Sequence, residues 1–247
     1  MAKTTSSRHQ LPIVILHGWA IDEQNEQKWL PFSEFLEVEG WKVIFLPIPG
    51  LSAPLEKVWQ LNDFVNWVHE KLHDYQHVIL LGHSFGGQLA VRYASVFPEQ
   101  VARLILIDPS GIRPFTMKAR LKRKVFGTAA KVGKVLFPLE MGRVLLHKLA
   151  REKDYLQASP TLRKTMQNVL EDEIKADFPR ITTPTCILWG DQDMATPVSH
   201  AQLFSSGIQN SQLHYIAGAR HSPQFTHVEQ TAKQVLSFLD QSYQADS

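Results

Sequence analysis

A serine between closely spaced glycines is the feature of this sequence best suited to chemistry. Ser84 lies in the run GHSFGG at residues 82–87, which matches the G-x-S-x-G pattern of a nucleophile elbow. In such an elbow the serine occupies a strained turn, so the residues two places away must be very small, as Gly82 and Gly86 are. An apolar segment precedes this run and a helical pattern follows it. We therefore predict that Ser84 is a nucleophile at a helix start, where backbone N–H groups favour negative charge.

A serine hydroxyl is a weak nucleophile at neutral pH and needs a neighbouring base. Among the 11 histidines, His221 has the most suitable position, because it follows the last predicted strand and precedes the last predicted helix. In a parallel sheet this loop opens at the same edge as the loop that contains Ser84. His83 is expected to be structural, because consecutive residues in a sharp turn point apart. His221 is thus the predicted general base.

The third member of such a triad orients the imidazole, and its loss costs about 10⁴ in turnover. Asp191 and Asp193 both follow the predicted strand at residues 185–189. Asp191 is expected to shape the turn, because an Asp after Gly often bonds its own backbone there. Asp193 reaches further into the loop and is the predicted acid. Asp191 and Asp108 remain the alternatives.

Acyl transfer also needs N–H donors for the oxyanion that forms in the transition state. One predicted donor is the backbone N–H of Phe85, the residue after the serine. The other is the N–H of Trp19, in the run HGWA at residues 17–20, where Gly18 permits close backbone approach. The Trp19 ring is expected to form a wall of the acyl pocket, the alternative being an ordinary core aromatic.

Short apolar segments alternate with longer amphipathic ones, which predicts an α/β fold with a parallel sheet between helices. The predicted strands span residues 11–16, 41–46, 77–81, 101–107, 185–189 and 212–216. The predicted helices span residues 30–39, 58–72, 88–96 and 228–239. The alternation stops between about residues 112 and 177, where helical patterns occur without a convincing strand. We therefore expect a core domain at residues 1–111 and 180–247, and an inserted helical cap, or lid, at residues 112–179.

The first half of the expected cap is strongly basic. Residues 113–151 contain eleven Lys or Arg and one acid, Glu140. Met117, Leu121 and Val125 recur every four residues among lysines, which predicts a basic amphipathic helix. Such a helix is suited to an acidic carrier protein, to the phosphates of CoA or to an anionic lipid surface; a solvated helix face is the alternative.

Composition narrows the class of protein. The 247 residues are 44% hydrophobic and 20% charged, with a net charge of +2, so the charge balance does not indicate a nucleic-acid binder. Cys186 is the single cysteine and lies in an apolar run, which favours a buried thiol over a nucleophile. The polar first ten residues and the lack of a long apolar run indicate neither a signal peptide nor a transmembrane segment. We expect a cytoplasmic protein.

These motifs resemble those of the α/β-hydrolase superfamily, from about residue 11 to residue 239 except for the cap. The resemblance rests on the HGW loop, the GHSFGG elbow, GDQD at residues 190–193 and GARH at residues 218–221, with the triad in the order Ser84, Asp193, His221. The HGWA run and the small size resemble, more narrowly, the carboxylesterases that cleave pimeloyl-acyl-carrier methyl esters. This resemblance implies an α/β-hydrolase fold with a mostly parallel sheet, and a cytosolic monomer with a helical lid and neither metal nor organic cofactor.

The predicted function is that of a serine carboxylesterase acting on a carboxylic ester or thioester through an acyl-serine intermediate. The same triad also serves C–C bond hydrolases, aminopeptidases and acyltransferases, and the elbow does not distinguish among them. A third hypothesis is a ligand-binding protein on a hydrolase scaffold with little turnover.

Overall fold

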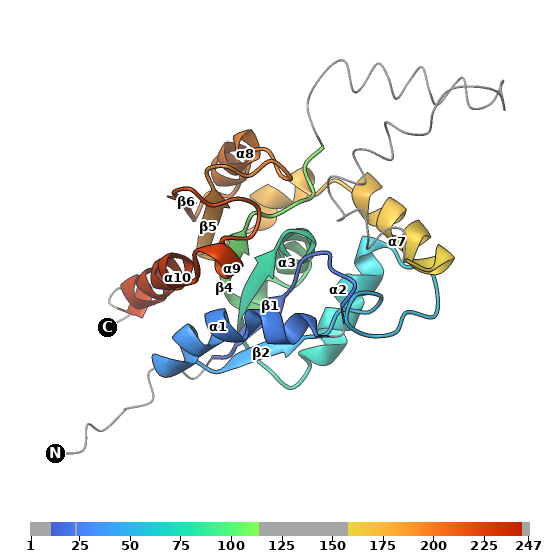
Figure 1. Cartoon of the computed structure of the whole chain (residues 1–247), viewed down its shortest axis with the longest axis horizontal. Helices are drawn as coiled ribbons and strands as arrows, with labels where there is room; N and C mark the ends of the chain where they lie inside the picture. The colour runs from blue at the N-terminus through green and yellow to red at the C-terminus, as the bar shows by residue number, and fades with distance from the viewer. Residues whose placement is uncertain (1–10, 23, 114–157, 244–247) are drawn as a thin grey trace.

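A computed structural model of the chain describes residues 11–22, 24–113 and 158–243 (Figure 1). At its centre is a six-stranded sheet in the order β2-β1-β3-β4-β5-β6, in which every adjacent pair is parallel. Its strands are β1 (Ile13–Leu16), β2 (Val43–Leu46), β3 (Val78–His83), β4 (Val101–Ile107), β5 (Thr185–Gly190) and β6 (Ser211–Ile216). Because all six strands run the same way, the loops at their carboxyl ends lie at one edge of the sheet.

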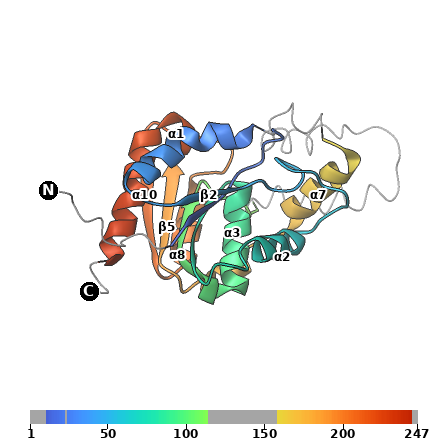
Figure 2. The same ribbon diagram turned by 90° about the horizontal axis from the view of Figure 1, so that it is seen from below.

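Helices cover both faces of the sheet (Figure 2). One face carries α1 (Asn25–Val38), the short α9 (Pro223–Thr226) and α10 (Val228–Tyr243). The other carries α2 (Leu61–Lys71), α3 (Phe85–Val96), α8 (Ser199–Gly207) and the 3₁₀ helix η2 (Lys175–Arg180). A further 3₁₀ turn, η1 (Pro98–Gln100), leads into β4.

Each face of the sheet has its own hydrophobic core. In β1, Val14 points into the core beneath α2 and α3, whereas Ile13 and Ile15 point into the core beneath α1 and α10. All three side chains are fully buried, as expected for a strand covered on both faces. Cys186 in β5 is likewise buried, as the sequence predicted.

The predicted strands are confirmed, each to within two residues at either end. The helices differ more. The helix predicted from residue 30 begins at Asn25 and continues through Pro31, a residue that normally marks the first turn of a helix. The helix predicted from residue 88 begins at Phe85, directly after the serine. Helix α8 was not predicted, because its sequence SHAQLFSSG has small polar residues and no clear apolar stripe.

The expected cap is described only in its last part. Residues 114–157, which include the basic helix expected around Met117, lie outside the described residues. Residues 158–179 form α7 (Pro160–Glu171) and most of η2, without a strand. The division into core and cap therefore stays a prediction.

This last part is attached to α3 by polar contacts that are buried or partly buried. The Arg92 guanidinium bonds the carboxylates of Asp177 and Asp172 at 2.7 and 2.9 Å. The side-chain amide of Gln88 donates to the carbonyl oxygens of Val169 and Asp172, both at 3.0 Å. Helix α3, which begins next to Ser84, thus also holds the segment that returns to the sheet.

Candidate active site

Ser84 lies in a strained turn at the junction of β3 and α3. Its φ of 53° and ψ of −117° are unusual for a residue with a side chain. A Cβ on Gly86 would lie 1.9 Å from the carbonyl oxygen of Leu16, and one on Gly82 would lie 2.4 Å from the carbonyl oxygen of Gly86. Only glycine fits either position, so the close packing explains the spacing of glycines around the serine.

Three side chains distant in sequence meet at the carboxyl edge of the sheet. The Ser84 hydroxyl oxygen lies 2.9 Å from Nε2 of His221, and Nδ1 of the same ring lies 2.8 Å from Oδ2 of Asp193. Ser84 follows β3, Asp193 lies in the loop after β5, and His221 in the loop after β6. The structure thus brings together the three residues that the sequence selected.

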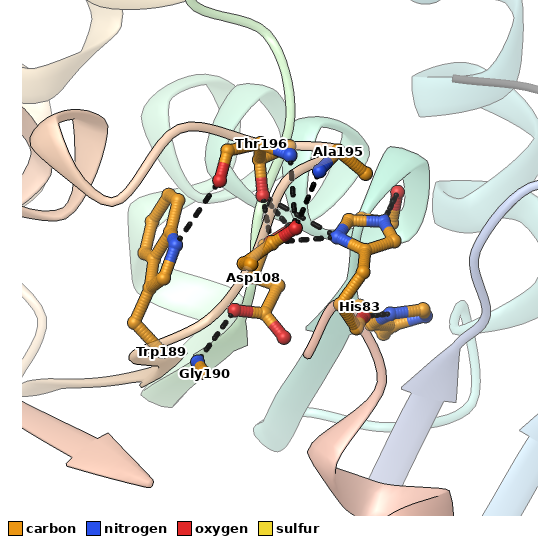
Figure 3. A network of polar contacts seen from close by, with 9 residues as sticks. His83, Asp108, Trp189, Gly190, Ala195 and Thr196 are labelled. Carbon is orange, nitrogen blue, oxygen red and sulfur yellow. Dashed lines mark hydrogen bonds and ion pairs between the residues drawn. The ribbon is translucent and has the colours of Figure 1, made fainter. Parts of the chain in front are cut away.

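Asp193 is held by the loop that contains it. Its Oδ1 accepts the backbone N–H groups of Ala195 at 2.7 Å and Thr196 at 3.1 Å, and its Oδ2 also accepts the Thr196 hydroxyl (Figure 3). Burial opposes ionisation of this carboxyl, but the bonds with His221, Thr196 and Ala195 together lower its pKa below the usual value. Asp193 is therefore ionised, and its charge faces the imidazole.

His83 supports the loop that carries His221. Its Nε2 lies 2.8 Å from the backbone carbonyl oxygen of His221, which only accepts, so Nε2 carries the proton. Burial, with a smaller contribution from the nearby His221, lowers the pKa of His83 to about 3. The ring is thus neutral at ordinary pH. Sequence reasoning placed His83 among structural residues but missed this contact, and it missed Thr196 altogether, because neither has a distinctive local pattern.

The loop after β1 lies directly against the serine. A Cβ on Gly18 would lie 3.1 Å from the Cβ of Ser84 and 2.6 Å from Nδ1 of His83. Phe85 is the first residue of α3, so its N–H has no partner one turn earlier in the helix. The Trp19 ring packs edge-on against the Phe85 ring, with 5.1 Å between the ring centroids. Trp19 is only partly buried, so it packs on the core and also reaches the surface.

The sequence of this chain matches the model of one protein family, described as the alpha/beta hydrolase fold, over residues 12–228. The chain belongs to the α/β-hydrolase family. It is 25% identical to the human monoacylglycerol lipase ABHD6, over 97% of this chain and 78% of that protein. It is 24% identical to the 2-hydroxy-6-oxononadienedioate/2-hydroxy-6-oxononatrienedioate hydrolase 1 of Pseudomonas putida, over 92% of this chain and 87% of that protein.

Solved structures of α/β-hydrolases have the same fold. The bromoperoxidase of Bacillus anthracis superimposes with a TM-score of 0.71 at 19% identity, over 93% of this chain and 92% of that one. None of the described helices of this α/β-hydrolase combines the length and apolarity that crossing a bilayer requires.

The other candidate residues of this α/β-hydrolase occupy different positions. Asp191 was predicted to bond the backbone of its own turn. Instead, its Oδ1 accepts the N–H of Gly218 at 2.8 Å and so joins the loops after β5 and β6. Burial raises the pKa of the Cys186 thiol to about 12, which makes it a poor nucleophile. Asp108 is fully buried near the three residues, with Oδ1 accepting the N–H of Gly190.

Proposed function

We propose that this α/β-hydrolase is a serine carboxylesterase that cleaves a carboxylic ester or thioester through an acyl-Ser84 intermediate. The observation that carries this proposal is the pair of contacts at His221, 2.9 Å to the Ser84 hydroxyl and 2.8 Å to Asp193. They supply a nucleophile, a base within hydrogen-bonding reach and an ionised group behind the base. The human relative at 25% identity is a lipase by name, which agrees with an ester substrate.

In the first half of the reaction, Ser84 Oγ attacks the ester carbonyl carbon while Nε2 of His221 takes the hydroxyl proton. The carbonyl oxygen becomes an oxyanion, for which we propose the backbone N–H groups of Phe85 and Trp19 as donors. The intermediate then collapses to the acyl-serine, and His221 gives its proton to the leaving alcohol or thiol. Asp193 stabilises the imidazolium throughout and keeps the proton of the neutral ring on Nδ1.

In the second half, water attacks the acyl-serine. His221 takes a proton from that water, and the resulting tetrahedral intermediate expels Ser84, which recovers its proton from the same ring. The carboxylic acid leaves and the site returns to its starting state. Each step uses the same two ring nitrogens, so a single displacement of His221 slows both halves.

Hydrolysis of short p-nitrophenyl esters tests the proposal. Wild type should release p-nitrophenol with a burst followed by turnover, and the S84A variant should show neither. S110A is the matched control: Ser110 also lies at this sheet edge, but its hydroxyl bonds the Gln88 side chain at 3.3 Å rather than His221. Wild-type turnover no higher than that of S84A would contradict the proposal. Tight ligand binding without turnover would instead favour a ligand-binding protein on a hydrolase scaffold.

A carrier-linked acyl substrate is the finer form of this proposal. It rests on the basic residues between positions 113 and 151, which lie almost wholly outside the described part of the chain. Hydrolysis of a substrate on an anionic carrier should weaken with added salt, while hydrolysis of a neutral ester should not. An equal salt response would remove the carrier from the proposal. The cytoplasmic location and monomeric state expected from the sequence remain predictions.

A further inference from the structure

A surface hollow away from the proposed triad gathers three histidines. His69, His73 and His77 all line it, together with residues of the turn between α3 and β4. The hollow has a volume of about 560 Å³. His77 directly precedes β3 and Ser84 directly follows it, so the hollow lies at the opposite edge of the sheet from Ser84. The six residues of β3 separate the two places by about 20 Å.

Backbone contacts fix the tautomer of two of these rings. Nδ1 of His73 lies 2.7 Å from the carbonyl oxygen of Glu70, and Nδ1 of His77 lies 2.8 Å from that of Glu99. A carbonyl oxygen only accepts, so Nδ1 carries the proton in each ring. Nε2 of the neutral ring therefore keeps its lone pair. Metal-bound histidines have this arrangement, because the nitrogen that does not bind the metal donates to an oxygen and so orients the ring.

The third ring, that of His69, is oriented by two contacts. It stacks on the Phe97 ring, with 4.0 Å between the centroids and 2° between the planes. Its Nδ1 lies 3.2 Å from Oε1 of Gln100. The amide nitrogen of Gln100 donates to the carbonyl oxygens of Leu72 and Tyr75, both at 2.8 Å, which turns its amide oxygen toward His69. Nδ1 of His69 therefore donates as well, and the lone pair is again on Nε2.

A carboxylate lies at ligand spacing from one of these nitrogens. Nε2 of His73 is 3.1 Å from Oδ1 of Asp74. Both atoms are acceptors when the ring is neutral, so a bond between them needs a cation, either a second ring proton or a metal ion. Two ligand atoms of a tetrahedral zinc site, each about 2.0 Å from the ion, are about 3.3 Å apart. The two atoms thus have nearly the spacing of two zinc ligands.

We propose that the hollow binds one divalent transition-metal ion, such as zinc, through Nε2 of the three histidines and the carboxylate of Asp74. Imidazole nitrogen is a suitable ligand for zinc, nickel and copper, whereas magnesium and calcium prefer oxygen. The ion joins the end of α2 and the turn after it to the start of β3. It takes no part in the chemistry at Ser84, so the inference is independent of the proposed esterase activity.

Binding requires the ligand atoms to converge. Among the described residues, the set of three whose ligand atoms lie within 4.8 Å of one another is His83, Asp108 and His221, at the proposed active site. The three histidines of the hollow are all exposed, and the His73 side chain is 70% exposed, so solvent leaves their rings room to rotate. Ordering these side chains costs conformational entropy, which the bonds to the ion must offset.

Isothermal titration of the whole chain with ZnCl₂ tests the proposal. We expect one tight zinc site per chain, and a rise in unfolding temperature that EDTA reverses, because a ligand of the folded chain alone stabilises it. H69Q, H73Q and H77Q should each weaken zinc binding at least about tenfold, since even a group that only orients a ligand contributes that much. MgCl₂ should produce neither binding heat nor stabilisation.

Two further variants serve this experiment. H214Q is the matched control, because it also removes one histidine, but His214 lies in β6 and does not line the hollow. It should leave the zinc affinity unchanged. H69F keeps a ring stacked on Phe97 and removes the ligand, so it replaces H69Q should that variant fold poorly. Thermal unfolding without zinc shows which variants are folded.

Three results would overturn the inference. The first is no zinc binding by wild type at millimolar zinc. The second is equal zinc affinity in wild type and in the folded triple variant H69Q/H73Q/H77Q. The third is zinc that inhibits ester hydrolysis and binds this triple variant as tightly as wild type, which would place the ion at His83, Asp108 and His221 instead. A wild type without esterase activity would contradict the proposed function and leave the zinc site standing.

Discussion

Nε2 of His83 lies 2.8 Å from the backbone carbonyl oxygen of His221, so the residue before the serine holds the loop that carries the base. In H83L this bond is lost and the loop can move away from Ser84. We expect kcat on a p-nitrophenyl ester to fall about tenfold, because catalysis depends on the reach between the two side chains. H83Q can restore an N–H donor at a similar reach and should recover part of the rate. Equal kcat values for H83L and H83Q would show that the hydrogen bond from His83 does not contribute to kcat.

Thr196 should contribute to turnover through Asp193. Its hydroxyl bonds Oδ2, the same oxygen that faces His221, so T196V leaves that carboxylate less firmly held. We expect kcat to fall several-fold, because losing this hydrogen bond should raise the activation free energy by about 1 kcal/mol. KM should be nearly unchanged. T183V is the control, because the Thr183 hydroxyl is also in a buried contact, with the carbonyl oxygen of Val101, away from the site. A similar loss of kcat in T183V would contradict the assigned role.

Gly18 should tolerate no side chain without loss of activity. In G18A the new Cβ would lie 2.6 Å from Nδ1 of His83. This clash must displace the loop that carries Trp19. We expect kcat to fall about tenfold or more as the proposed oxyanion donor moves. G207A makes a comparable clash, 2.4 Å from the Phe178 ring, on a distant helix. It should lower thermal stability and leave kcat of the folded protein unchanged.

His17 should make the folded protein sensitive to acid. The ring is buried; Nε2 faces the Ile48 N–H at 3.2 Å and the Ser52 hydroxyl at 2.8 Å, and burial lowers its pKa from 6.5 to about 4. Between these two pH values the unfolded chain binds a proton that the folded chain does not, so stability falls as pH falls. The loss should approach about 3 kcal/mol near pH 4, measured by urea unfolding.

Two variants check this assignment. H17Q removes one titrating ring and should weaken the dependence of the unfolding free energy on pH across this window by about 3 kcal/mol. A dependence remains, because burial also lowers the pKa of His83, to about 3. S52A removes the hydroxyl partner and keeps the ring, so it should keep the dependence. The same slope in H17Q as in wild type would assign the acid sensitivity to other groups.

Local patterns were enough to predict the sheet and the three central residues. Strand β4 was located without error, because its apolar run is bounded by clear turn signals, and the elbow pattern identified Ser84. Residues whose contacts are made entirely across the fold were not predictable. The bond from His83 to His221 spans 138 positions, and nothing in either local sequence indicates it. The start of α1 was misplaced for another reason, since Pro31 lies inside a helix whose tertiary packing tolerates it.

The ion pairs of Arg92 with Asp172 and Asp177 have a practical consequence for protein engineering. They fix the point at which the chain re-enters the core, using a side chain of α3 itself. A chimaera that replaces the expected cap should therefore keep Arg92, Asp172 and Asp177 in place. Substrate preferences of such chimaeras would test whether the expected cap selects the substrate while the chemistry at Ser84 stays the same.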